Sequence, residues 1–222
     1  MANTITAGNA TNNGLALLPD NTGALNILTG SGSGTAAISI DASQNVTAAA
    51  GLTVTGNLTL TGNASGIIKS GTAVASTSGT SIDFTGIPST AKRITVMLRS
   101  ISTTGTSNYL IRIGNTTFTA TGYTSVMNYV NIGANSCTGD TDTTGFRLTK
   151  DTTAAWSFSA VATIVQQTSG FYICTFTGMN AGGPGYFGTG ILNLGSDLDR
   201  VRITTVNGTD TFDAGTINIF WE

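Results

Sequence analysis

The stretch LGSDLDRVRITTVNGTDTFDAGTINIFWE, residues 194–222, decides the fold of this chain. Apolar and polar residues alternate on both sides of Asn207-Gly208, a dipeptide that favours the positive φ angles of a tight turn. Such alternation is typical of β-strands with one buried face. The stretch therefore predicts two strands. Because Phe220 and Trp221 stand at its end, we expect the last strand to lie inside a sheet rather than to fray into water.

The same alternation recurs through residues 66–222, with turn signals about every ten residues and no window of helical period. Regular strands of this kind predict an all-β terminal domain of the β-sandwich or jelly-roll type. The residues expected on its inward faces include Ile94, Val96, Leu98, Trp156, Phe158, Ala160, Ala162 and Ile164.

Residues 36–64 carry a thin apolar stripe at even positions, in which Gln44 is the one polar break. Within it, LTVTGN is followed at once by LTLTGN, a six-residue repeat. One chain cannot bury so thin a stripe, so we expect three copies to wind into a short fibrous β-shaft, residues 35–65, and the protein to be a homotrimer. The alternative is a single hairpin packed on the terminal domain. The expected shaft core is Ile38, Ile40, Leu52, Val54, Leu58 and Leu60.

Residues 1–34 are polar and glycine-rich, with short apolar runs only at 15–18 and 25–28. Those runs predict a weak strand pair, followed by a hinge at 30–34. So little apolar mass contributes little to a core. We therefore expect this segment to attach the protein to a larger assembly.

The composition narrows the range of partners. Charged residues make up 9% of the chain, the formal net charge is −2 and the pI is near 4.9, so no basic patch predicts nucleic-acid binding. No run of 18 uncharged apolar residues predicts a membrane span, and the first residues do not form a signal peptide. Two cysteines, Cys137 and Cys174, fit reduced thiols, although their pairing stays open. Low charge favours association with other protein chains.

The chemical inventory disfavours an enzyme. The sequence has no histidine, and its only glutamate is Glu222. A two-carboxylate mechanism would need aspartates, and the neighbouring pairs Asp140/Asp142 and Asp197/Asp199 are more typical of turns in which the carboxylate bonds its own backbone. A calcium loop would need a third acidic position and a bidentate glutamate. We expect neither a cofactor nor a metal site, with a calcium site completed by neighbouring loops left open.

Two blocks carry a resemblance to a known family. The run LDRVRITTVNGTDTFDAGTINIFWE, together with SIDFTGIPSTAKRITVMLRSISTTGTSNYLIRIGN at 81–115, is similar to the C-terminal β-domain of bacteriophage tail-fibre-like virion proteins. The resemblance implies a virion surface protein made in the host bacterial cytoplasm. Its function would be that of a fibre or spike whose terminal domain binds a host-surface glycan or protein. The alternative is a capsid-decorating, head-fibre or tail structural protein with an assembly role and no receptor binding.

Receptor recognition, if it occurs, is expected at aromatic residues in loops. Tyr186 and Phe187 stand in a glycine-rich stretch, and adjacent side chains of an extended segment face opposite ways, so at least one ring is expected to be exposed. Tyr123 and Tyr129 are further candidates, since a flat ring face can stack on a sugar. The alternative is that Phe187 begins a strand while Tyr186 packs on a neighbouring subunit.

Overall fold

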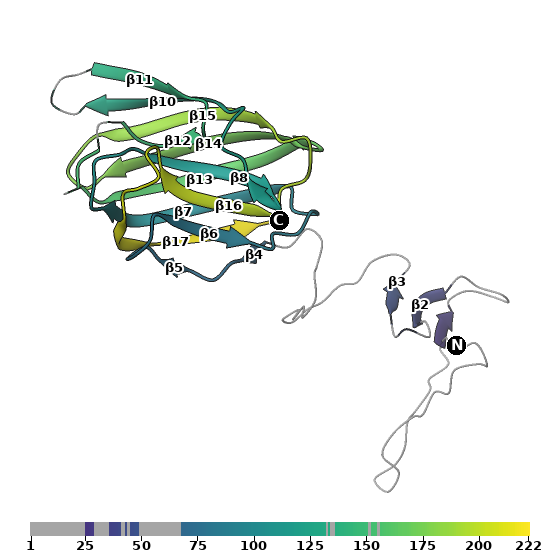
Figure 1. Ribbon diagram of the computed structural model, residues 1–222. Coiled ribbons are helices and arrows are strands. Elements are labelled where there is room, and N and C mark those ends of the chain that lie inside the picture. The colour runs from purple at the N-terminus through teal and green to yellow at the C-terminus, as the bar shows by residue number, and fades with distance from the viewer. Residues whose placement is uncertain are drawn as a thin grey trace, which may run out of the picture. The chain divides into compact units, whose positions relative to one another are not determined.

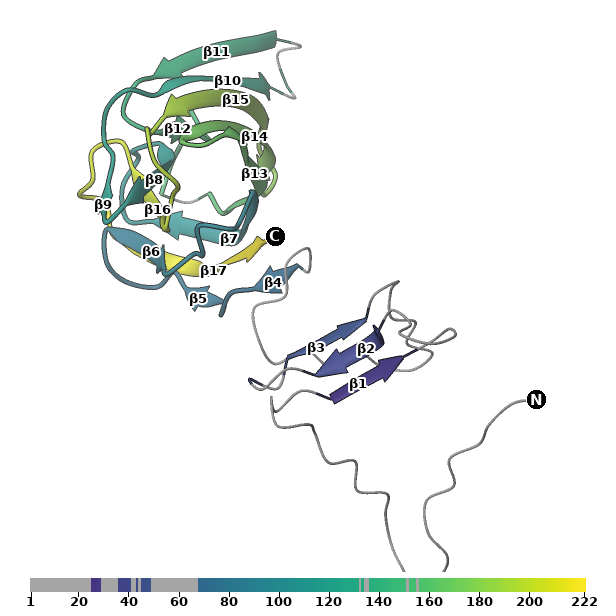
Figure 2. The same cartoon turned by 90° about the vertical axis from the view of Figure 1, so that its right-hand side faces the viewer.

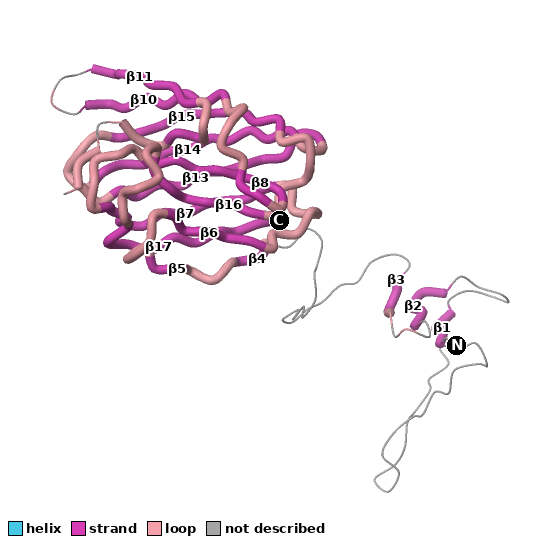
Figure 3. Tube along the Cα trace, in the orientation of Figure 1, coloured by secondary structure: helices cyan, strands magenta, loops and turns pink. Residues whose placement is uncertain are grey.

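A computed structural model describes residues 25–28, 36–40, 43, 45–48, 68–131, 133, 136–150, 152–154 and 156–222. The chain forms two compact units, Met1–Gly62 and Asn63–Glu222. All regular elements in the described ranges are β-strands, and every strand pair is antiparallel (Figures 1 and 3). The prediction of an all-β fold is therefore confirmed.

The first unit contains a three-stranded sheet of β1 (Leu25–Leu28), β2 (Ala36–Ile40) and β3 (Val46–Ala48), with β2 in the centre. β1 pairs with β2, so the pairing crosses the expected boundary between residues 34 and 35. Ile38 and Ile40, both half-buried, lie opposite Ala48 and Val46 of β3. The expected shaft residues Leu52, Val54, Leu58 and Leu60, and the apolar run at 15–18, lie outside the described residues.

The second unit contains one large and one smaller sheet. The larger has the order β11-β10-β15-β14-β13-β7-β17-β4, with β5 also paired to β17, and the smaller has the order β12-β8-β16-β6, with β9 paired to β8. The strands are β4 (Lys69–Ser70), β5 (Val74–Ala75), β6 (Ser81–Thr85), β7 (Arg93–Thr103), β8 (Tyr109–Asn115), β9 (Thr117–Phe118), β10 (Thr124–Asn131), β11 (Ser136–Asp142), β12 (Phe146–Arg147), β13 (Phe158–Thr168), β14 (Phe171–Asn180), β15 (Gly185–Asn193), β16 (Arg200–Thr205) and β17 (Phe212–Trp221).

The two sheets of the second unit curve around a single apolar core (Figure 2). Alternate residues of each long strand enter this core, as the period of two requires. The expected inward positions of β7 and β13 are all buried, which confirms that part of the prediction, whereas Trp156 precedes β13 and is half-buried. The buried positions of these two strands include Ile94, Val96, Leu98, Phe158, Ala160, Ala162 and Ile164.

The C-terminal strand lies inside the larger sheet, as the sequence predicts, between β7 and the short strands β4 and β5. Trp221 is half-buried against the core. The Asn207-Gly208 turn is present, and Gly208 has a φ of 67°. It carries the chain from one sheet to the other, because β16 pairs with β8 whereas β17 pairs with β7. The step from β7 to β8 makes the matching crossing between the sheets.

Candidate functional site

Tyr186 and Phe187 lie in β15, not in a loop, which corrects that expectation. Their side chains point to opposite faces of the sheet, so Tyr186 is 2% exposed and Phe187 is 44% exposed. The Tyr186 hydroxyl accepts a bond from Asn180 Nδ2 at 3.0 Å and donates to the Lys150 carbonyl at 3.1 Å. Its ring packs edge-on against Phe158, with 5.6 Å between centroids. Tyr186 therefore fills the core of its own chain, and only Phe187 offers a ring to solvent.

Tyr123 is also a core residue, with 2% exposure. Its hydroxyl accepts a hydrogen bond from the backbone N–H of Ile113 at 2.8 Å and lies 3.2 Å from the Thr119 carbonyl. Burial raises the pKa of the Tyr123 phenol to about 12. Its ring meets Phe146 edge-on at 4.9 Å, so it has no face left for a ligand.

Tyr129 is half-buried and faces inward from β10. Its ring lies 6.0 Å from that of Tyr186, its register partner on β15. The structure thus brings Tyr129 and Tyr186 together on the inner side of the larger sheet and leaves Phe187 alone on the outer side. The four rings do not form one surface, and the burial of Tyr123 and Tyr186 rules out a stacking platform at either residue.

The first acidic pair is occupied by structural contacts. The Asp140 carboxylate lies 2.9 Å from the Arg147 guanidinium, and the Asp142 carboxylate lies 3.8 Å from it. Asp142 also accepts bonds from the backbone N–H and the hydroxyl of Thr144, each at 2.6 Å. This local bonding is the turn geometry that the sequence predicts for Asp142.

The second acidic pair is occupied as well. Asp197 accepts a bond from the Gln166 amide at 2.5 Å, and Asp199 accepts one from Arg200 at 2.6 Å. The bond from Arg200 lowers the pKa of the Asp199 carboxyl. Within the described ranges, no three histidine, cysteine, aspartate or glutamate side chains gather closely enough to hold a metal ion.

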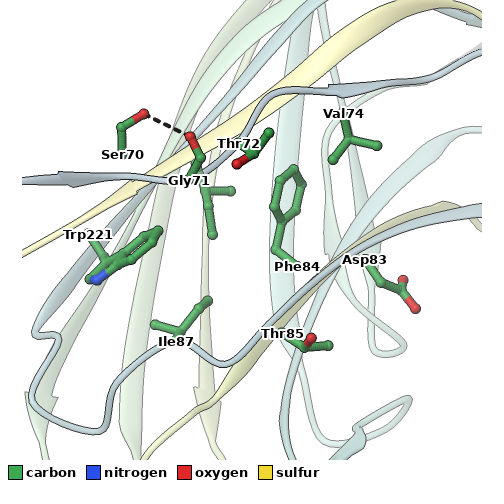
Figure 4. A pocket seen from close by; sticks show the side chains of 10 residues that line it. Ser70, Gly71, Thr72, Val74, Asp83, Phe84, Thr85, Ile87 and Trp221 are labelled. Atoms are coloured by element: carbon green, nitrogen blue, oxygen red, sulfur yellow. Dashed lines mark hydrogen bonds between the residues drawn. The ribbon is translucent and has the colours of Figure 1, made fainter.

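A cleft lies between the two sheets, where β6 ends the smaller sheet and β4, β5 and β17 end the larger one (Figure 4). Its volume is about 370 Å³. Phe84 and Ile87 are buried residues of its floor, and the Trp221 indole stands at one side. The exposed residues Ser70 and Thr72 bring hydroxyl groups beside them, whereas the Thr85 side chain shares the outer face of β6 with Asp83. The cleft thus combines an apolar floor, one large aromatic side chain and hydroxyl groups.

The β4–β5 segment lines one side of the cleft and is held there by contacts with β17. Gly71 N–H donates to the Ile219 carbonyl at 2.8 Å, and a Cβ at this position would lie 3.1 Å from Ile219 Cγ1. The Ser70 hydroxyl donates to the Gly71 carbonyl at 2.9 Å and accepts from the Asn218 amide at 3.3 Å. These bonds place Ser70 and Thr72 at the mouth without covering it.

Asp83 is the one charged residue among those that line the cleft, and it is neutralised on its outer side. Because Phe84 points inward, the neighbouring Asp83 side chain points away from the cleft (Figure 4). Both of its carboxylate oxygens accept bonds from Arg202, at 2.7 and 2.6 Å. The Arg202 guanidinium lies 4.1 Å from the centre of the Phe118 ring. A ligand in the cleft therefore meets no unpaired charge.

No family model, curated protein or solved structure matches this chain. In the part of the chain that the structure describes, there is also no helix long and apolar enough to span a membrane.

Sequence reasoning missed the cleft because its residues come from 70–87 and from the end of the chain, 219–221. They meet only when β17 pairs with β4 and β5 and when β6 takes its place in the opposite sheet. The sequence feature that could have indicated the cleft is Trp221. From the sequence alone, Trp221 is expected only to help bury the last strand.

Proposed function

We propose that this chain is a non-enzymatic virion surface protein of bacteriophage type, a fibre or spike, and that its C-terminal domain binds a neutral host-surface glycan at the cleft between β6 and β17. The observation that carries the binding role is this uncharged cleft with an aromatic side chain and a hydroxyl rim. A volume of 370 Å³ falls within the usual range of small-molecule sites, roughly 300–1,000 Å³.

A pyranose ring suits this chemistry. It has an apolar face that can pack against Trp221, and its hydroxyls can exchange hydrogen bonds with Ser70 and Thr72. Affinity at one such site is weak, and several copies on one particle multiply it by avidity. The engaged acidic pairs and the absence of histidine from the sequence support binding without chemistry.

The strand connections support the finer description of the fold that we propose. Successive strands β7 and β8 cross from one sheet to the other, and β16 and β17 cross back beside them. Nested crossings of this kind are typical of jelly-roll sandwiches. We propose that the first unit attaches the domain to other virion proteins, and that the apolar stripe of residues 36–64 joins three copies in a β-shaft. Nucleic acid and membrane insertion have no part in this function.

A capsid-decorating or tail structural protein without receptor binding is the second candidate. The observation that favours it is the group of exposed apolar side chains on the outer face of the larger sheet, which suits packing against protein more than capture of a soluble ligand. The first candidate requires the cleft to bind a glycan, whereas the second does not.

Glycan-array binding by the full-length chain tests the receptor role. We expect binding to neutral glycans, with loss of at least tenfold in affinity for Trp221→Leu and Thr72→Val, since each removes one of the two contact types. Thr209→Val, in the exposed turn before β17, is the matched control and should bind as the wild type. Binding to no glycan, or equal binding by all four proteins, would refute the receptor role and leave the assembly role.

A further inference from the structure

The outer face of the larger sheet concentrates exposed apolar side chains. Ten large apolar side chains are exposed in the described ranges, and seven of them point outward from β10, β13, β14 and β15. Scattered apolar residues are normal on a protein surface, whereas a continuous group marks an interaction site. The seven are Val126, Val130, Val161, Val165, Met179, Phe187 and Ile191, with exposed fractions between 39% and 52%.

Charge is sparse on this face. The strands β10, β13, β14 and β15 contain no aspartate, glutamate, lysine or arginine at all. Strand β7, which lies beside β13 on the same face, adds Arg93 and Arg99, and Arg93 pairs with Glu222 at 2.6 Å. A strongly charged partner gains nothing on such a surface. The four uncharged strands of two identical copies meet without repulsion.

Threonines run across the centre of the face in register. Thr163 of β13 pairs with Thr95 of β7 on one side and with Thr175 of β14 on the other, and Thr175 pairs with Thr189 of β15. A hydroxyl both donates and accepts hydrogen bonds, so a row of threonines can satisfy an identical row. Rows of carboxylates or guanidinium groups could not. The threonine row of one copy can therefore form hydrogen bonds with the same row of a second copy.

The size of the face fits a stable interface between subunits. Six strands lie side by side in the order β10-β15-β14-β13-β7-β17. With about eight paired residues each, they give a face roughly 29 Å wide and 27 Å long, or about 780 Å². A standard protein interface buries about 800 Å² on each partner. The whole face is thus the area that one specific contact requires.

We infer that this outer face is buried against a second copy of the chain. The inference extends the proposed assembly role, but it concerns the second unit alone and depends neither on the stripe of residues 36–64 nor on any receptor. It requires a two-fold axis, because only that symmetry brings the same face of two copies together.

Sedimentation equilibrium of the full-length chain at micromolar concentration tests the inference. The wild type should have the mass of two or more 22.5 kDa chains. Phe187→Lys and Val161→Lys each place an unpaired charge in the contact and should weaken association at least tenfold. Val206→Lys is the matched control, because Val206 is 40% exposed but lies outside the face, and it should associate like the wild type.

Far-UV circular dichroism shows whether each variant is folded, and Val126→Lys provides an independent substitution on the same face. A wild-type mass of one chain would overturn the inference, as would folded lysine variants of the face that associate as strongly as Val206→Lys. Glycan binding by the cleft is measured separately, so failure here leaves the proposed receptor role untouched.

Discussion

Replacing Tyr123 with phenylalanine removes one oxygen atom from the core of the second unit. The Tyr123 hydroxyl accepts a hydrogen bond from the backbone N–H of Ile113 at 2.8 Å. Phenylalanine has no oxygen, so the substitution takes this acceptor away from a buried N–H. An unsatisfied buried N–H costs about 1–3 kcal/mol. For a domain of this size, about 2 kcal/mol corresponds to a fall in Tm of roughly 4–8 °C.

The same substitution has a pH dependence of known sign. The pKa of Tyr123 rises to about 12 in the folded chain, against 10.0 for an ordinary tyrosine. The unfolded chain therefore ionises first, and the stability held below pH 10 is lost as the pH rises from 10 toward 12. At pH 11, one unit above the pKa in the unfolded chain, this loss of stability is about 1.4 kcal/mol. Phenylalanine cannot ionise, so the stability difference between the two proteins should shrink by that amount.

Urea unfolding of both proteins at pH 7 and pH 11 measures the two effects. Tyr109, whose pKa is also raised to about 12, and Tyr172 contribute equally to both proteins and cancel in the difference. Tyr129→Phe is the control, because the Tyr129 hydroxyl has no hydrogen-bond partner among the described residues. Tyr123 has no such role if Tyr123→Phe is as stable as the wild type at pH 7, or if the difference in stability is the same at both pH values.

Two further predictions follow from β14 and β15. Gly190→Ala puts a Cβ 2.7 Å from the Phe146 ring and 3.0 Å from the Thr124 carbonyl, so it should lower the free energy of unfolding by about 1–3 kcal/mol. Gly185→Ala in the same strand meets its nearest atom at 4.0 Å and should be nearly neutral; equal effects in chemical denaturation would contradict this account of the glycines. Maleimide labelling of the native chain should modify the exposed Cys137 and spare Cys174, because burial shields the Cys174 thiol and raises its pKa. Labelling of both thiols before denaturation would show that the β14 core is open.

Alternation predicts the strands and much of the core, because a half-buried sheet forces a period of two on the sequence. It also predicts that Tyr186 and Phe187 face opposite ways. It does not predict that they lie in a strand, since the surrounding glycines look like loop signals. Gly188 and Gly190 are inside β15, and they make room for the rings of Phe176 and Phe146. Glycine in a strand can mark such close packing as well as a turn.

The cleft and the outer face are harder to predict from sequence. The cleft depends on which strands end each sheet, and local patterns do not determine strand order. On the outer face, valine, isoleucine and threonine suit both sides of a strand, so the exposed apolar positions look like further core. The complete lack of charge in three successive long strands, β13 to β15, is the one signal in the sequence that could have found the face.

We propose that this chain is a structural protein on the surface of a virus particle. A low-resolution electron microscopy map of purified particles, with antibody fragments bound to the second unit, tests it directly. We expect bound antibody on projections from the particle surface, with the second unit outermost. Particles that contain no copy of this chain, or that hold it inside the shell, would contradict the claim.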